Sequence, residues 1–163
     1  MGRRARRYWL MKSEPSSYSI HDLERDGEAG WDGVRNYTAR NYMRDEMKVG
    51  DLVLFYHSNA KPPAVAGLAR VCREAYPDPT QLDPKSKYFD PAATEDAPRW
   101  FQVDLAHVET FDEPVSLARL KSEADRLGGM MVIQRGIRFS VQPVERAHCA
   151  HVLKLANART KIR

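Results

Sequence analysis

Short runs of apolar residues, each ended by turn-forming residues, dominate the sequence. The run at residues 52–56 is continuously apolar, which is typical of a strand covered on both faces. Residues 64–71 alternate small and apolar side chains and follow through Pro62 and Pro63, so the two segments are predicted to form a hairpin. Further strands are predicted at residues 8–11, 100–106 and 139–141, and in the second of these Phe101, Val103 and Leu105 should face the core.

Helix signals lie between these strands. Ser19 and Asp22 have the spacing of a capping box, which predicts a short helix that ends near Gly27. Asn36 can cap a helix over residues 37–47. Further helices are predicted at residues 116–120 and 122–127 and from Pro143 onward. Because strands and helices do not alternate regularly, the pattern predicts an α+β fold around a small bent sheet or barrel flanked by short helices.

Residues 77–98 interrupt this pattern. They contain five of the ten prolines and many polar residues, so a regular element is not expected there. The segment is predicted to be a surface excursion, and its length is typical of a functional loop. One alternative function is therefore a protein-interaction module that uses this loop as its contact surface.

Length and composition limit the domain organisation. The 163 residues, 42% of them hydrophobic, predict one domain at residues 8–156 with basic tails at residues 1–7 and 157–163. Apolar runs stay well short of the roughly 20 residues that span a bilayer, so a membrane role is not expected. The N-terminal segment lacks the features of a secretory signal. We expect an intracellular protein, cytoplasmic or, in a eukaryote, nuclear.

The formal net charge of +4 is unevenly distributed. The two tails contribute seven positive side chains and no acids, so the body of the chain is slightly acidic. Within the body, residues 34–73 carry seven Lys or Arg against three acids, whereas residues 74–113 carry ten acids against three Lys or Arg. We expect one basic face, with the tails adding a salt-sensitive, non-specific attraction for phosphates.

A hydrolytic site is an alternative that the residues leave open. Asp51, His57 and Ser58 have the residue types of a catalytic triad, but neighbouring residues of a strand point to opposite faces. A small hydrolase could instead pair His57 with a carboxylate such as Asp51 or Glu14. This alternative requires a hydrogen bond between the two groups in an open pocket.

Signatures of metals and cofactors are weak in this sequence. Cys72 and Cys149 have neither the number nor the spacing of a disulfide scaffold or a zinc site. His148 and His151 are three residues apart on a predicted helix, but a third ligand is missing nearby. Glycine-rich nucleotide-binding motifs and Cys-x-x-Cys pairs are absent from the sequence. We expect no metal and no cofactor.

Aromatic and hydrogen-bonding residues gather at three turns, at residues 9–14, 31–37 and 56–59. A pocket for an extruded nucleobase needs flat apolar surfaces together with donors and acceptors for the edge of the base. These clusters supply both kinds of group. On composition alone, however, an ordinary role as core aromatics and turn caps is favoured.

The same clusters carry a resemblance to a known family. The motifs are Trp9-Leu-Met-Lys-Ser-Glu-Pro15, Trp31-Asp-Gly-Val-Arg-Asn-Tyr37, Gly50-Asp51 and Phe55-Tyr-His-Ser58, followed by Tyr76-Pro-Asp78, Asp83-Pro-Lys-Ser-Lys-Tyr88, Pro98-Arg-Trp100 and Ser140-Val-Gln-Pro143. In order and spacing they resemble the EVE domain of the PUA-like superfamily, from Tyr8 to about Ala156. The resemblance implies a small, strongly bent β-barrel flanked by helices and related to the YTH reader domains.

The resemblance also implies a function. It implies a domain that reads modified bases, chiefly modified cytosines in DNA and also modified RNA, without catalysis. A chain of this length is then expected to bind nucleic acid alone or with a protein partner that supplies an effector activity. Carried over to matching positions, the pocket candidates are Trp9, Lys12, Ser13, Trp31, Val34, Arg35, Asn36, Tyr37, Ser58 and Trp100.

Roles can be assigned to several of these candidates. Trp100 is as well suited to burial in the sheet as to a pocket wall, and Arg40 could equally be a solvated helix residue. The roles expected are stacking or wall formation for Trp31 and Trp100, reading of the base edge for Ser13, Asn36 and Ser58, and phosphate contact for Arg35 or Arg40.

Overall fold

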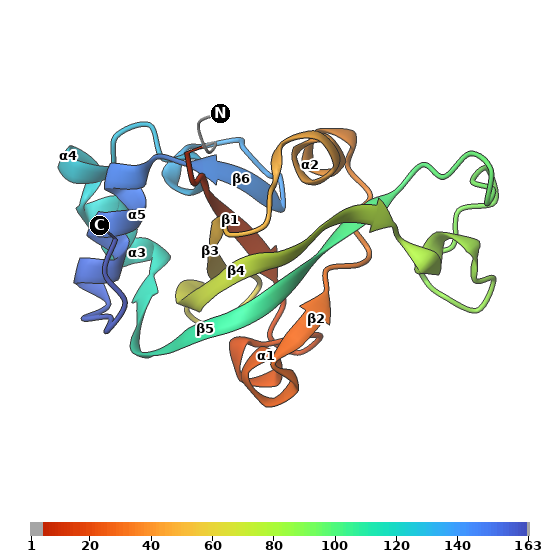
Figure 1. The fold of residues 1–163 in the computed structure, drawn as a ribbon. Coiled ribbons are helices and arrows are strands. Elements are labelled where there is room, and N and C mark those ends of the chain that lie inside the picture. Colours follow the sequence, from red (N-terminus) through yellow and green to blue (C-terminus); the bar gives the residue numbers. More distant parts are fainter. Residues whose placement is uncertain (1–4, 163) are drawn as a thin grey trace.

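A six-stranded mixed sheet forms the centre of the molecule in the computed structural model, which describes residues 5–162 (Figure 1). The sheet has the order β2-β5-β4-β3-β1-β6, with β1 and β3 parallel and the other pairs antiparallel. The predicted hairpin of β3 and β4 is confirmed. The strands are β1 (Tyr8–Ser13), β2 (Glu28–Gly30), β3 (Leu52–His57), β4 (Ala64–Pro77), β5 (Phe101–Ser116) and β6 (Val141–Val144).

Short helices flank the sheet, as predicted for an α+β fold. The capping box at Ser19 is confirmed, and the side chain of Asn36 accepts a hydrogen bond from the backbone N–H of Ala39 at 2.9 Å. The helices are α1 (Ile20–Asp26), α2 (Tyr37–Asn41), α3 (Leu117–Ser122), α4 (Ala124–Leu127) and α5 (Arg146–Leu155), with a π-helical turn η1 (Tyr42–Glu46) and 3-10 turns η2 (Pro79–Leu82) and η3 (Met131–Ile133).

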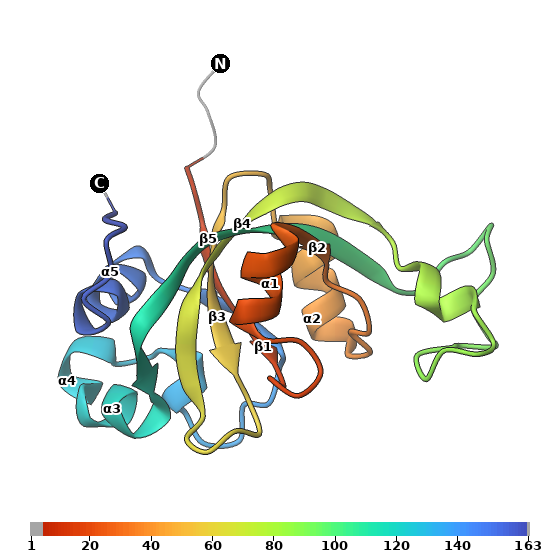
Figure 2. The same ribbon diagram turned by 90° about the horizontal axis from the view of Figure 1, so that it is seen from below.

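The apolar side chains form two core clusters on opposite faces of the sheet. Alternation along the central strands sends Leu10 and Leu54 into the cluster beneath α3, α4 and α5, and sends Met11 and Phe55 into the cluster beneath α1 and α2. Figure 2 shows α3, α4 and α5 grouped together at one side of the molecule, apart from α1 and α2. The continuous apolar run of β3 is therefore covered on both sides, as predicted.

Several predictions about the elements were wrong. Both β4 and β5 continue well beyond the predicted segments, because they pair with each other through charged positions such as Arg73 opposite Asp104. Pro143 lies in β6, opposite Trp9, rather than at a helix start, since an edge strand tolerates a residue without an N–H. The C-terminal helix begins at Arg146. The short strand β2 was not predicted, and the helix predicted over residues 37–47 changes to a π-helix at Tyr42.

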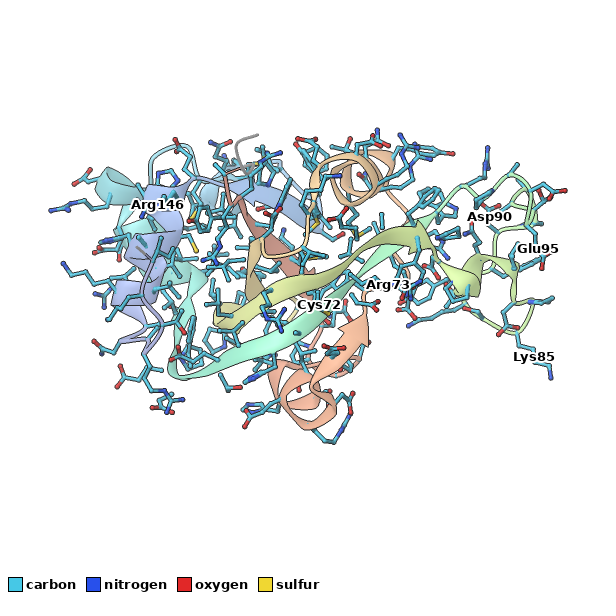
Figure 3. All side chains as sticks on the ribbon, viewed as in Figure 1. Cys72, Arg73, Lys85, Asp90, Glu95 and Arg146 are labelled. Atoms are coloured by element: carbon cyan, nitrogen blue, oxygen red, sulfur yellow. The ribbon has the colours of Figure 1, made fainter. Side chains whose placement is uncertain are left out.

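The segment predicted as an excursion projects from the ends of β4 and β5, and Figure 3 shows Lys85, Asp90 and Glu95 on it. It is ordered by the fully buried amide of Gln81. This side chain donates to the carbonyl oxygens of Asp78 and Trp100 and accepts from the backbone N–H groups of Arg99 and Trp100, at 2.8–2.9 Å. The excursion is thus tied to the strands that carry it.

The described parts of the two predicted tails contact the domain. The guanidinium of Arg7 pairs with Glu46 at 2.8 Å and lies 4.6 Å from the ring centroid of Trp9. At the other end, the backbone N–H groups of Arg159 and Thr160 donate to the carboxylate of Glu109 at 2.8 and 2.9 Å. Arg3, Arg4 and Arg163 lie outside the described residues. In the chain from residue 5 to 162, no helix has the length and apolar character needed to cross a membrane.

Candidate functional site

A cavity of about 780 Å³ opens where β1 and β3 end, a volume within the range of ligand pockets. Ser13 and Ser58 stand at these two strand ends, which are joined by a hydrogen bond from the Ser58 N–H to the Ser13 carbonyl at 3.0 Å. The remaining walls come from the loop between β1 and α1, from β2 and the loop after it, from the excursion and from the segment before β6. The lining residues are Lys12, Ser13, Glu14, Ser17, Tyr18, Ala29, Gly30, Trp31, Asp32, Gly33, Val34, Arg35, Ser58, Lys87, Tyr88, Arg138 and Ser140.

Three aromatic side chains line the cavity. Trp31 packs its ring against the edge of Phe55, with centroids 5.3 Å apart and an interplanar angle of 85°. The hydroxyl of Tyr18 donates to Asp26 at 2.8 Å, which fixes its ring. Tyr88 lies against Gly33, whose φ of +79° favours glycine. These rings supply flat surfaces of the kind that stack on a nucleobase.

Gly33 is essential to the placement of Tyr88. A Cβ at this position would lie 2.6–2.9 Å from three ring carbons of Tyr88. Gly33→Ala should therefore lower the free energy of unfolding by about 2–4 kcal/mol, through the left-handed backbone and the displaced ring together. Gly27→Ala is the matched control because Gly27 has the same φ of +79° and open space around it. Chemical denaturation of both variants measures the difference, and equal losses would contradict the proposed role of the ring contact.

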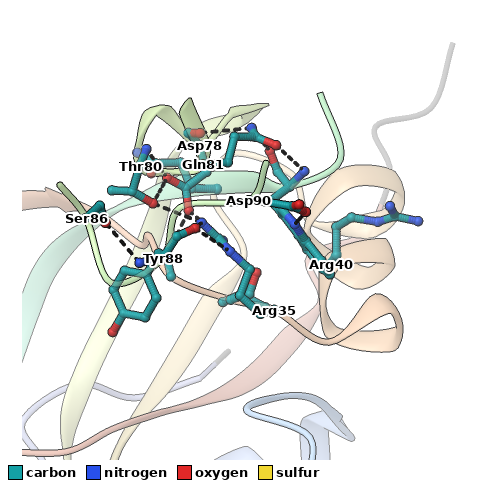
Figure 4. A network of polar contacts seen from close by, with 12 residues as sticks. Arg35, Arg40, Asp78, Thr80, Gln81, Ser86, Tyr88 and Asp90 are labelled. Atoms are coloured by element: carbon teal, nitrogen blue, oxygen red, sulfur yellow. Dashed lines mark hydrogen bonds and ion pairs between the residues drawn. The ribbon is translucent and has the colours of Figure 1, made fainter. Parts of the chain in front are cut away.

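Arg35 fastens the excursion to the cavity (Figure 4). Its guanidinium donates to the carbonyl oxygen of Tyr88 at 2.7 and 3.1 Å, to the carboxylate of Asp78 at 3.1 Å and to the hydroxyl of Thr80 at 3.0 Å. Asp78 also accepts from the N–H of Gly33 at 2.8 Å. Burial acts to raise the pKa of Asp78, but the hydrogen bonds from Thr80 and Gly33 hold the pKa below its usual value. Arg35 thus positions Tyr88 as a wall of the cavity.

The charged groups of the lining are mainly positive. Lys12, Arg35, Lys87 and Arg138 outnumber the two acids Glu14 and Asp32. Burial, with the charge of Arg138, lowers the pKa of Lys12, and burial, with the charge of Asp78, raises the pKa of Asp32. Both shifts reflect partly desolvated side chains. A ligand that carries phosphate would meet this positive lining.

Hydrogen-bonding groups are available beside the rings. The Oγ of Ser13 donates its proton to the carbonyl of Tyr18 at 2.6 Å, so its lone pairs can accept from a ligand. Ser17, Ser58 and Ser140 also line the cavity. The cavity therefore offers acceptors and donors together with flat walls.

The structure separates the predicted pocket residues into two groups. Lys12, Ser13, Trp31, Val34, Arg35 and Ser58 line the cavity, whereas Trp9, Asn36, Tyr37 and Trp100 are not among the lining residues. Trp9 is fully buried, and its indole N–H donates to Asp51 at 3.0 Å. Asn36 caps α2, while Tyr37 and Trp100 stack on each other with centroids 4.9 Å apart.

Two aromatic residues that form walls of the cavity, Tyr18 and Tyr88, were not among the predicted pocket residues. Tyr88 belongs to a motif that was recognised at residues 83–88, but its place beside Gly33 depends on contacts with residues more than 50 positions away. Tyr18 precedes the cap of α1 at Ser19 and lies outside the three turn clusters that the sequence singled out. Lys87, Arg138 and Ser140 also line the cavity without having been named as pocket candidates.

Asp51 and His57, two residues of the hydrolase alternative, have other contacts, whereas Glu14 lines the cavity. The carboxylate of Asp51, 1% exposed, accepts from the indole of Trp9 and from the backbone N–H groups of Arg7 and Lys48 at 3.0–3.1 Å. The Nε2 of His57 accepts from the backbone N–H of Ile20 at 3.1 Å, and burial lowers the pKa of this imidazole. Asp51 thus joins the start of β1 to the turn before β3, and His57 joins β3 to the start of α1. In the described part of the chain, no group of three or more His, Cys, Asp or Glu side chains is placed to hold a metal ion.

Comparison with solved structures gives strong similarities over nearly the whole chain. A Pseudomonas putida protein is 52% identical with a TM-score of 0.88, covering 91% of this chain and 99% of that one. Human thymocyte nuclear protein 1, crystallised in complex with 5-methylcytosine-containing DNA, is 38% identical with a TM-score of 0.87, covering 94% and 99%. The Mmi1 YTH domain, solved with RNA, shares the fold at 12% identity and a TM-score of 0.53.

Sequence comparison agrees with these structures. Full-length thymocyte nuclear protein 1 of Homo sapiens is 41% identical over 165 residues, which cover 91% of this chain and 73% of that protein. The EVE domain pattern matches residues 7–155. Together with the YTH likeness, this confirms the predicted PUA-like fold. The chain belongs to the EVE domain family.

Proposed function

We propose that this chain is a non-catalytic nucleic-acid-binding module that holds a modified base in the cavity lined by Trp31, Tyr18 and Tyr88. The favoured base is a modified cytosine in DNA, with RNA as the alternative nucleic acid. The observation that carries the proposal is a cavity of about 780 Å³ that combines three aromatic side chains with a predominance of positive groups. The DNA complex of human thymocyte nuclear protein 1 supports the choice of 5-methylcytosine.

The proposed recognition follows from the chemistry of an extruded base. The rings supply stacking surfaces, the serine hydroxyls and Asp32 supply partners for the base edge, and Lys12 or Arg138 neutralises a phosphate. An unpaired base costs less to place in such a site than a paired one, because it does not have to leave a duplex. Single-stranded DNA should therefore bind more tightly than the same sequence in a duplex. An effector activity would be supplied by a protein partner.

A binding panel tests this function. Single-stranded DNA and RNA oligonucleotides with one central cytosine, 5-methylcytosine, adenine or N6-methyladenine are titrated and followed by fluorescence anisotropy. We expect a preference of about ten-fold or more for 5-methylcytosine over cytosine, and an unchanged mass of the oligonucleotide after incubation. Asn36→Ala, which alters the cap of α2 outside the cavity, should keep this preference. Equal affinity for every oligonucleotide would overturn the proposal.

Binding should also depend on the protonation state of the Lys12 amine. Because burial and Arg138 lower the pKa of Lys12 from 10.5, its positive charge is lost at a lower pH than that of an ordinary lysine. Affinity for the modified oligonucleotide should then fall as the pH rises from about 7 to about 10, since the neutral amine no longer attracts phosphate. Lys12→Arg stays protonated and should flatten this profile. Identical profiles for the wild type and Lys12→Arg would rule out this contribution.

A further inference from the structure

An exposed aromatic stack lies outside the cavity at the start of α2. Tyr37 is 49% exposed, and its ring is stacked on Trp100 with an angle of 22° between the planes. Trp100 is itself buried, and its indole N–H donates to the carboxylate of Asp90 at 2.7 Å. The position of the Tyr37 ring is therefore set by a fixed neighbour, while much of the side chain remains open to solvent.

Arg40 lies beside this stack, and Arg44 lies beside the neighbouring Phe101. The guanidinium carbon of Arg40 lies 4.6 Å from the ring centroid of Tyr37, and that of Arg44 lies 6.0 Å from the ring centroid of Phe101. Arg44 pairs with Asp45 at 2.8 Å, whereas Arg40 donates to neutral oxygens, the carbonyl of Arg99 and the side chain of Asn41. These neutral partners do not offset the positive charge of Arg40, which lies beside an exposed ring. This arrangement suits a phosphate next to a stacked base.

The stack is continuous with the cavity through Arg35. This side chain lines the cavity, and its guanidinium carbon lies 5.3 Å from the ring centroid of Trp100. A continuous row of side chains therefore runs from the cavity through Arg35 and Trp100 to Tyr37. A strand whose base enters the cavity would leave along this surface.

We propose that Tyr37, held by Trp100, forms a second subsite that stacks on the base of a nucleotide flanking the one in the cavity, with Arg40 contacting the connecting phosphate. This inference rests on the proposed function, because it needs a strand anchored in the cavity. Stacking on an aromatic ring is tolerant of sequence, so this subsite adds affinity for single-stranded nucleic acid without adding preference for a particular base.

The test compares a nucleoside with a strand. 5-Methyl-2′-deoxycytidine occupies the cavity alone, whereas a single-stranded DNA of about nine nucleotides with one central 5-methylcytosine reaches both subsites. Tyr37→Ala should weaken binding of the oligonucleotide about ten-fold and leave binding of the nucleoside unchanged, as measured by anisotropy and calorimetry. Tyr37→Phe keeps the ring and should bind both like the wild type. Thr38→Ala, an exposed neighbour on α2, is the matched control.

The outcomes separate this inference from the function on which it rests. If Tyr37→Ala, shown by thermal melting to be folded, binds the oligonucleotide like the wild type, the second subsite is wrong and the cavity is unaffected. Loss of nucleoside binding in Tyr37→Ala would also contradict it, because the ring would then belong to the cavity. If the wild type binds neither ligand, the proposed function itself fails and the subsite with it.

Discussion

Trp31→Ala is expected to weaken binding of the 5-methylcytosine oligonucleotide by about a hundred-fold, at the upper end of what one stacking side chain contributes. The indole forms a wall of the cavity and is itself fixed against Phe55. Trp31→Phe keeps an aromatic wall and should weaken binding by about ten-fold or less. Anisotropy titrations of both variants measure these losses.

The stability of the Trp31 variants must be measured alongside. Trp31 is only 7% exposed, so its removal should also lower the free energy of unfolding by about 3–5 kcal/mol. Titrations are therefore made at a temperature at which circular dichroism shows each variant folded. A folded Trp31→Ala protein with wild-type affinity would show that the base lies elsewhere.

Arg35→Ala should cause the second large effect, on stability as well as binding. Removal of the guanidinium leaves the fully buried Asp78 carboxylate without its cationic partner and frees the carbonyl of Tyr88. The expected cost is about 3–5 kcal/mol, equivalent to a fall in melting temperature of roughly 10 °C. Arg35→Lys should restore only part of the lost stability, because a lysine ammonium cannot make the set of hydrogen bonds that the planar guanidinium makes.

The salt dependence of binding distinguishes the two roles of Arg35. If Arg35 places the Tyr88 wall, the variant binds more weakly but keeps the wild-type salt slope. If Arg35 contacts a phosphate, as the sequence predicts, the slope falls by about one. Lys48→Ala, which removes an exposed ion pair with Glu74 outside the cavity lining, serves as the control and should melt like the wild type. Equal melting temperatures for Arg35→Ala and the wild type would contradict the positioning role.

Local patterns predicted those elements that depend on neighbouring residues. The caps at Ser19 and Asn36 act over three positions, and the continuous apolar run of β3 reflects cover on both faces. The ends of β4 and β5 could not be predicted in this way. These strands extend through charged residues because β4 and β5 pair with each other. The alternation of apolar and polar residues within one segment does not show which other segment it pairs with.

The candidate site was predictable in part for the same reason. Ser13 and Ser58 were both named as pocket candidates at predicted strand ends, and the parallel pairing of β1 and β3 brings them together. Trp9 and Trp31 look equivalent in the sequence, but Trp9 hydrogen-bonds to Asp51 inside the core whereas Trp31 reaches the cavity. The wall at Tyr88 depends on Arg35, 53 positions away, and a single sequence does not reveal such a contact.

The most direct test of the central claim follows the indole N–H signals of the three tryptophans by ¹⁵N-edited NMR during titration with 5-methyl-2′-deoxycytidine. Trp9 and Trp100 donate to Asp51 and Asp90, whereas Trp31 lines the cavity, so the three report on distinct environments. A base in the cavity should shift the Trp31 signal together with the amides of Ser13, Ser58 and Tyr88, and leave the Trp9 signal in place. Saturable binding that leaves the Trp31 signal and these amides unmoved would contradict the account.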